Sequence, residues 1–235
     1  MTSQSGYQGV PERIIAIDGP SGVGKGTLAR WLSHRLGYEI LDSGSIYRLA
    51  ALHVLRSKVD IQNQDEVVSA CAKMKIAFES NLDTIQVFLN SENVSMAIRN
   101  EKTGMTASII SAYPDLRALL LQKQRDFATD KGVVADGRDM GTVVFPEAKY
   151  KFFLDADAKV RAMRRFDELV AKGETPDFDN VYEQLAKRDH QDRTRKVAPL
   201  VAADDAVTID TTSRSIEEVQ LLVLRHINFS TGILL

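Results

Sequence analysis

Cysteine is almost absent from this sequence of 235 residues, in which Cys71 is the single example. One cysteine excludes an internal disulfide framework and any zinc site with several cysteine ligands. No apolar run approaches the roughly 20 residues that a membrane-spanning helix requires. No sign of charge dominates, because 30 Lys and Arg face 32 Asp and Glu. That balance argues against bulk nucleic-acid binding.

The first residues lack the features of a targeting segment. Residues 1–9 are polar and have neither the basic start nor the apolar middle of a signal peptide. We therefore expect a flexible tail over 1–9, a single unit over 10–235, and a cytoplasmic protein that does not bind membranes. With 44% hydrophobic residues, a chain of this length can bury roughly 70% of its unfolded surface without a disulfide or a structural metal.

Five short apolar runs, each followed by an aspartate, predict buried strands. Continuous apolar strands separated by helical patterns indicate an α/β protein whose parallel sheet has helices on both faces. Ligands of such sheets bind beyond the carboxyl ends of the strands. The runs are 13–17, 38–41, 132–135, 151–154 and 206–209, and the aspartates are Asp18, Asp42, Asp136, Asp155 and Asp210. We interpret Asp155 and Asp210 as turn or cap residues.

Helical periodicity fills most of the space between these strands. We expect helices over 27–36, 45–55 and 114–127, the first closed by Gly37 and the last opened by Pro114. The stretch from about 59 to 110 does not fit strand–helix alternation. It predicts a small antiparallel insertion with strands over 75–78, 84–89 and 94–97 and a hairpin turn over 90–93.

The strongest chemical signal is a glycine-rich segment between the first strand and the first helix. Glycines allow the backbone N–H groups to approach a polyphosphate, and the following helix adds positive charge at its N-terminus. Lys25 would reach the outer phosphates. The segment consists of Gly19, Pro20, Ser21, Gly22, Val23, Gly24, Lys25, Gly26 and Thr27. A glycine-rich segment with a lysine, placed between a strand and a helix, predicts a nucleotide-binding P-loop.

The loop departs from the common P-loop pattern at one position. Gly26 stands where the hydroxyl ligand of Mg²⁺ usually lies, and the hydroxyl follows at Thr27. Two arrangements are then open for Mg²⁺. Either the Thr27 hydroxyl binds the ion, directly or through a water, or a water takes the place of the usual hydroxyl ligand. Lys-Gly-Thr is typical of nucleoside monophosphate kinases, and the sequence has no Asn-Lys-x-Asp guanine-reading motif.

Three further segments carry charged and hydroxyl side chains to the same expected edge of the sheet. The first segment, 42–48, combines Asp, Ser and Gly with Tyr47 and Arg48 at this expected edge. An N-cap residue followed by an amphipathic helix would explain the same residues equally well without a functional role. The second, 135–142, places Asp136 where an acidic residue commonly orients Mg²⁺ or its waters. The third, 159–196, is rich in arginine and is either a solvated helical face or a mobile lid that excludes water.

Taken together, these segments resemble the bacterial-type cytidylate kinases, a group of the nucleoside monophosphate kinases with the P-loop fold. The resemblance covers about 14–215 and rests on 19–27, 41–48, 136–146 and 188–200. It implies a five-stranded parallel sheet, an antiparallel nucleotide-binding insertion and a short helical lid. The expected parts are a core of 10–58, 109–158 and 197–235, an insertion of 59–108 and a lid of 159–196.

The resemblance also implies an activity and its site residues. It implies in-line transfer of the ATP γ-phosphoryl group to CMP or dCMP with Mg²⁺, by a monomer. We expect ATP to contact the P-loop, Arg164 and Arg165, and Mg²⁺ to contact Thr27 and Asp136. The catalytic cations would be Lys25, Arg138, Arg188 and Arg195. Contacts with the CMP phosphate and sugar would come from Ser43, Tyr47, Arg48, Arg138, Arg188, Asp192 and Arg195, and contacts with cytosine from Ser108, Arg117 and Asp139.

Three alternatives remain at this stage. The acceptor could be another monophosphate or a small alcohol such as shikimate. The protein could instead be a nucleotide-dependent switch, which would hydrolyse ATP or GTP slowly without an acceptor. It could also be a degenerate family member that binds nucleotides without turnover.

Overall fold

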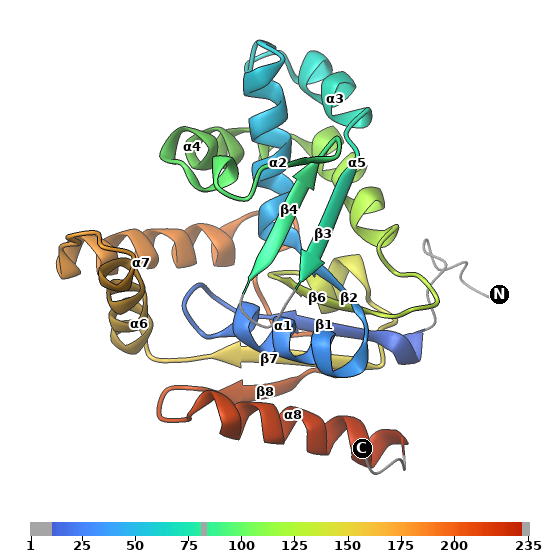
Figure 1. Cartoon of the computed structure of the whole chain (residues 1–235), viewed down its shortest axis with the longest axis vertical. Coiled ribbons are helices and arrows are strands. Elements are labelled where there is room, and N and C mark those ends of the chain that lie inside the picture. Colours follow the sequence, from blue (N-terminus) through green and yellow to red (C-terminus); the bar gives the residue numbers. More distant parts are fainter. Residues whose placement is uncertain (1–10, 81–83, 232–235) are drawn as a thin grey trace. The chain divides into compact units, whose positions relative to one another are not determined.

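The structure, a computed structural model, describes residues 11–80 and 84–231. Residues 1–9, for which we expected a flexible tail, lie outside the described residues. The chain divides into two compact units (Figure 1). Unit 1 combines the segment ending at Ile14 with residues 30–135, and unit 2 combines 15–29 with 136–235. The division falls within helix α1 (Lys25–Leu36) and within strand β6 (Val133–Gly137).

The predicted parallel sheet is present, with strand order β2-β6-β1-β7-β8. The other strands of this sheet are β1 (Ile14–Asp18), β2 (Glu39–Asp42), β7 (Tyr150–Asp155) and β8 (Val207–Asp210). β1 pairs with β7 from Ile15 opposite Tyr150 to Asp18 opposite Phe153, and β7 pairs in parallel with β8. Each aspartate that we placed after a strand belongs to the strand itself. Asp155 and Asp210 accept backbone N–H bonds from the turns that follow, as expected.

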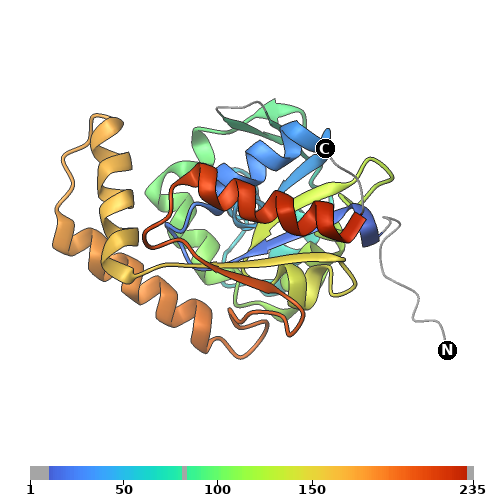
Figure 2. The ribbon, with the colours of Figure 1, turned by 90° about the horizontal axis from the view of Figure 1, so that it is seen from below.

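Unit 2 carries the C-terminal helices. Helices α6 (Ala158–Ala171) and α7 (Phe178–Thr194) lie side by side in both views and share a small apolar core (Figures 1 and 2). That core consists of Ala162, Val181 and Leu185. Helix α8 (Ile216–Thr231) packs on β7, where the ring of His226 meets Phe152 edge to face at 5.6 Å. None of the helices described here is long and apolar enough to cross a membrane.

Unit 1 is organised around helix α2 (Ser43–Arg56), which packs against α3, α4 and α5 (Figure 1). Asp42 caps α2 by accepting the N–H of Ser45, and asparagines cap α3 and α4 in the same way. Pro114 occupies the first turn of α5, as predicted. The bounds are α3 Gln64–Ala72, α4 Glu101–Ile110 and α5 Pro114–Arg125, with 3-10 turns η1 Pro11–Arg13 and η2 Ala97–Arg99. Burial of Cys71 in α3 raises the pKa of its thiol to about 11.

The antiparallel sheet is shorter than the sequence suggested. It consists of β3 (Ile76–Ser80), β4 (Ile85–Leu89) and β5 (Glu92–Asn93). Our prediction of a strand over 94–97 was wrong. Asn90 and Ser91 both adopt positive φ, which makes a two-residue turn, so pairing resumes two residues earlier than expected. The Asn93 side chain then accepts from Ser95 and ends the strand. We also missed α3 and α4 in this stretch.

Candidate active site

The glycine-rich segment forms a loop between β1 and α1 in unit 2. Three of its glycines, Gly19, Gly22 and Gly24, adopt φ values of +146°, +82° and +93°. The Gly24 carbonyl accepts the first helical bond, from Leu28. A side chain at Gly22 would meet backbone and Cβ atoms of Arg161 at 3.0–3.1 Å. The loop therefore needs glycine both for its backbone conformation and for its close packing.

Gly19→Ala is expected to destabilise the fold far more than Gly24→Ala. A Cβ at position 19 would lie 2.1 Å from the Leu154 carbonyl oxygen, whereas a Cβ at position 24 meets nothing within 4 Å. Both variants carry the cost of a positive φ, about 1–2 kcal/mol, but only the first adds a backbone clash. Thermal unfolding measures the difference. Equal melting temperatures for the two variants would contradict the packing argument.

Lys25 lies inside the loop and is almost completely buried. Its Nζ donates to the Pro20 carbonyl at 2.8 Å and lies 3.9 Å from a carboxylate oxygen of Asp136. Burial, reinforced by the Arg138 charge, lowers the pKa of Lys25 to about 7, although Asp136 and Asp18 oppose the shift. An anion bound in the loop would favour the charged form again, because it supplies the opposite charge that burial removes.

Asp18, the last residue of β1, is buried and holds a distant turn. Its Oδ1 accepts the N–H of Met140 and its Oδ2 that of Gly141, both at 2.8 Å. These amides begin a single-turn π-helix, η3 (Met140–Val144). Burial raises the pKa of Asp18 to about 6, and the two N–H bonds limit the shift. Sequence analysis assigned Asp18 no role.

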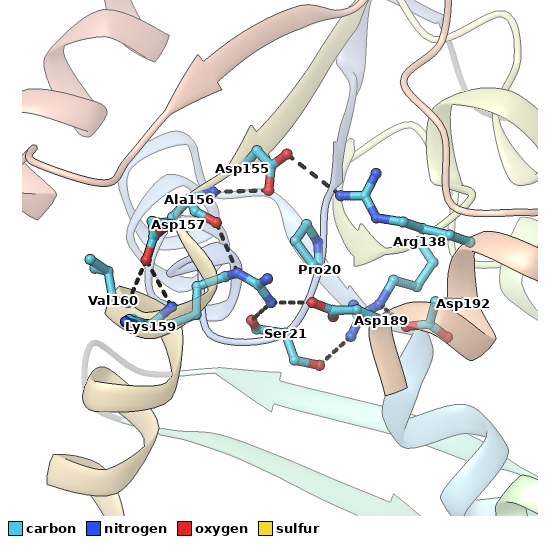
Figure 3. Close-up of polar contacts among 12 residues, drawn as sticks. Pro20, Ser21, Arg138, Asp155, Ala156, Asp157, Lys159, Val160, Asp189 and Asp192 are labelled. Carbon is cyan, nitrogen blue, oxygen red and sulfur yellow. Dashed lines mark hydrogen bonds and ion pairs between the residues drawn. The ribbon is translucent and has the colours of Figure 1, made fainter. Parts of the chain in front are cut away.

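Arg138 connects the turn before η3 to both the P-loop and α7 (Figure 3). Its Nε donates to the Asp192 carboxylate at 2.7 Å and its Nη2 to the Ser21 hydroxyl at 2.7 Å. Three residues for which we expected substrate contacts therefore lie together in unit 2. In this arrangement they satisfy one another, so a bound nucleotide would have to replace some of these bonds.

Arg161 is a second arginine at the P-loop, and sequence analysis missed it. Its side chain is only 6% exposed, which is unusual for a charged group. The guanidinium donates to the carbonyls of Ala156 and Ser21 and pairs with Asp189 of α7 at 2.5 Å. Arg161 lies on the same helix as Arg164 and Arg165. Nothing in the sequence indicates which of the three side chains contacts the P-loop.

The two arginines that we assigned to ATP contact Thr211 and Glu168. Arg164 donates to the carbonyl and hydroxyl of Thr211, whose hydroxyl in turn donates to Val23 of the P-loop. Arg165 is exposed and pairs with Glu168 one turn along α6. Arg164 therefore reaches the loop only through Thr211.

Asp139 and Arg195 form a further pair in unit 2. Arg195 is the C-cap residue of α7, in an extended conformation just beyond the helix. Its Nη2 lies 3.5 Å from Asp139 Oδ2 and is buried without a hydrogen bond. A buried guanidinium nitrogen without a hydrogen bond is costly, so it favours an additional acceptor such as a phosphate oxygen. Arg188 is exposed on α7 and contributes to the positive potential at Lys25.

The remaining candidate residues lie in unit 1. Ser43 is buried at the start of α2, and Tyr47 and Arg48 follow on the same helix. The Arg117 guanidinium of α5 lies 5.6 Å from the centre of the Tyr47 ring, a cation–π contact. Arg48 donates to the Ile98 carbonyl at 3.0 Å. Ser108 is exposed on α4. The candidate residues on the helices of this unit are therefore Ser43, Tyr47, Arg48, Ser108 and Arg117.

A comparison with protein families decides the wider relationship. The family model of cytidylate kinases matches residues 15–228. The chain belongs to the cytidylate kinase family. It is therefore a nucleotide kinase, a transferase, and the fold and the P-loop described above are those of a kinase of this family.

Curated cytidylate kinases of several bacteria align with this family member over almost their whole length. The protein of Haemophilus ducreyi is 48% identical over 214 residues, which cover 91% of this chain and 96% of the relative. That of Mannheimia succiniciproducens is 48% identical over 215 residues, covering 92% and 96%. That of Vibrio vulnificus is 47% identical over 214 residues, covering 91% and 95%.

The carboxylates of this cytidylate kinase family member fit one mode of Mg²⁺ binding. Mg²⁺ is usually held by one or two carboxylates together with substrate phosphates and waters. Each oxygen of Asp18 already accepts a backbone amide. Asp136, with a side chain 17% exposed beside Lys25, fits, and Thr27 is exposed in the first turn of α1. Within residues 11–80 and 84–231 no group of three His, Cys, Asp or Glu side chains could hold a metal ion alone, so a Mg²⁺ here would depend on nucleotide phosphates.

Proposed function

We propose that this protein transfers the γ-phosphoryl group of ATP directly, in line, to CMP and dCMP. Its membership of the cytidylate kinase family is the observation that carries the proposal. The P-loop with a buried lysine supports ATP as the donor, because such loops bind polyphosphates through amides and a lysine. The buried guanidinium nitrogen of Arg195 without a hydrogen bond supports an anionic acceptor.

The chain's own residues would stabilise charge rather than form a covalent intermediate. The acceptor phosphate is already an anion, so the reaction needs no strong general base. Lys25 would exchange its bond to the Pro20 carbonyl for the transferring phosphoryl group. Arg138, Arg188 and Arg195 would neutralise the charge that spreads over the equatorial oxygens. Lid helices α6 and α7 carry or flank these cations and would exclude water.

We assign acceptor binding to the following residues. Ser43, Tyr47 and Arg48 would contact the CMP phosphate and sugar, and Asp192 the sugar hydroxyls. We assign recognition of cytosine to Ser108, Arg117 and Asp139, because a carboxylate accepts from the exocyclic amine and an arginine donates to the ring acceptors. Mg²⁺, held by Asp136 and Thr27 with nucleotide phosphates, would supply additional positive charge. We assign the ATP contacts to the P-loop and, through Thr211, to Arg164, with Arg165 nearer the solvent.

The extents of the parts are also proposals. We propose a nucleotide-binding insertion of 59–108, which contributes Ser108 to the acceptor site, a lid of 159–196 that excludes water, and a core of 10–58, 109–158 and 197–235. We further propose a cytoplasmic monomer that needs no nucleic acid and no membrane. Light scattering should then give a mass close to the 26.1 kDa of one chain.

Assays with a panel of possible phosphoryl acceptors test this function. We expect ADP release from Mg·ATP with CMP and dCMP well above the rates with UMP, AMP, GMP, dTMP or shikimate, because the proposed base contacts fit only cytosine. A blank without acceptor serves as the control. Equal rates with CMP and UMP would keep the kinase but overturn the assignment of Asp139. ADP release in the blank that no acceptor increases would overturn the proposed function and favour a nucleotide-dependent switch.

A further inference from the structure

The carboxylate of Asp18 joins two parts of unit 2 that are far apart in the sequence. On one side, Asp18 is bonded to Gly19 and so to the start of the P-loop. On the other, its two oxygens hold the backbone amides of Met140 and Gly141, both at 2.8 Å. Arg138 and Asp139 immediately precede these amides. This carboxylate therefore ties the segment that carries both side chains to the start of the P-loop.

The turn that Asp18 holds has an unusual backbone conformation. Asp139 has φ −145° and ψ 25°, outside the helical region, and its carbonyl accepts from both Val143 and Val144. Such a π-turn is a rare local conformation that is often found at functional sites. A Cβ on Gly137 would meet the Met140 side chain at 2.7 Å, so the segment is also tightly packed on the other side.

The hydrogen bonds of Asp18 indicate a structural use of its carboxylate. Each of its oxygens accepts one backbone N–H group. The residue is 4% exposed. An aspartate at a strand end can simply bond to the turn that follows it, as Asp210 does at the end of β8 by accepting from the N–H and hydroxyl of Thr212. Asp18 instead uses both oxygens for a segment more than 120 residues away.

We propose that Asp18 is a positioning residue that holds Arg138 and Asp139 in register with the P-loop. The proposal rests on the proposed function, because Arg138 and Asp139 are assigned there to the acceptor. It predicts a specific defect: acceptor binding and base selectivity should deteriorate while ATP binding at the P-loop persists. A residue that only stabilises the fold would impair both alike.

Asp18→Asn is the test variant, because asparagine has the same shape but keeps one acceptor and turns an NH₂ group toward the second amide. We expect kcat/KM for CMP to fall about tenfold to a hundredfold, the loss typical of misplaced catalytic groups, with a smaller CMP-over-UMP ratio. The dissociation constant of a non-hydrolysable ATP analogue should change less than about threefold. Asp210→Asn is the matched control, since its carboxylate serves only an exposed local turn, and it should behave as wild type.

Two further measurements keep the proposal falsifiable. Hydrogen exchange at the Met140 and Gly141 amides should accelerate in Asp18→Asn, and this readout needs no CMP. If that variant does not fold, Gly141→Ala provides the second, because a Cβ there would lie 3.4 Å from Asp18 Oδ2 and 3.2 Å from the Lys151 side chain. Gly141→Ala should also lower kcat/KM for CMP and the CMP-over-UMP ratio while ATP-analogue binding persists, with smaller losses than Asp18→Asn.

The outcomes separate this proposal from the proposed function. A wild-type enzyme that does not phosphorylate CMP would overturn the function, while the exchange experiment would still decide whether Asp18 holds the turn. A wild-type enzyme that uses CMP, together with an Asp18→Asn variant of unchanged selectivity and unchanged amide exchange, would overturn the positioning role. So would equal losses in ATP and CMP binding.

Discussion

Lys25→Met is expected to reduce kcat by about 10³-fold or more while leaving the fold intact. The lysine supplies the one buried cation inside the described P-loop, and cations or donors aimed at the transferring group contribute factors of this size. Methionine fills the space of the aliphatic stem. Because burial lowers the pKa of Lys25, its charge is disfavoured in the folded state, and the neutral variant should melt at the same temperature or higher.

The measurement is steady-state ADP release at saturating Mg·ATP and CMP, with thermal unfolding of the same preparation. Lys123→Met is the matched control. Lys123 is half-buried and donates to the carbonyls of Ala72 and Met74, outside any assigned site, so its loss should leave turnover within about twofold to threefold. A Lys25→Met enzyme with turnover close to wild type would show that the lysine is not the catalytic cation.

Asp139→Ala is expected to lower the CMP-over-UMP ratio of kcat/KM by roughly 10- to 100-fold. Cytosine presents an amine where uracil presents a carbonyl, so a carboxylate partner accepts from the first and repels the second. Asp139 is 8% exposed, and this burial should make the discrimination strong. In unit 2 its carboxylate pairs with Arg195 at 3.5 Å.

Asp192→Asn provides the comparison for this selectivity test. Asp192 is assigned to the sugar, which CMP and UMP share, so its loss should lower both rates and leave their ratio unchanged. It would also release Arg138, to which it is bonded at 2.7 Å. Measured kcat/KM values for both nucleotides with each variant check the prediction. Unchanged selectivity in Asp139→Ala would move the base reader to another residue.

Much of the fold followed from the sequence because its determinants are local. Apolar runs with a terminal aspartate identified all five strands of the parallel sheet, and Pro114 and Gly37 marked helix ends. The spacing of glycines and Lys25 identified the P-loop, since a backbone at positive φ and a helix N-terminus need particular residues at fixed distances. The insertion was less predictable, because its short strands depend on a turn at Asn90 and Ser91 and its helices on capping by asparagine.

The sequence by itself determined the family, the P-loop and the set of charged residues available for chemistry. Only the tertiary structure decided how those residues are paired. Asp18, Arg138 and Arg161 each have a partner more than 100 positions away along the chain. Periodicity and short-range spacing carry no information about such partners, because sheet pairing and helix packing determine which side chains meet. For that reason only the fold shows that Arg161 contacts the P-loop and that Asp18 holds the turn that follows Arg138 and Asp139.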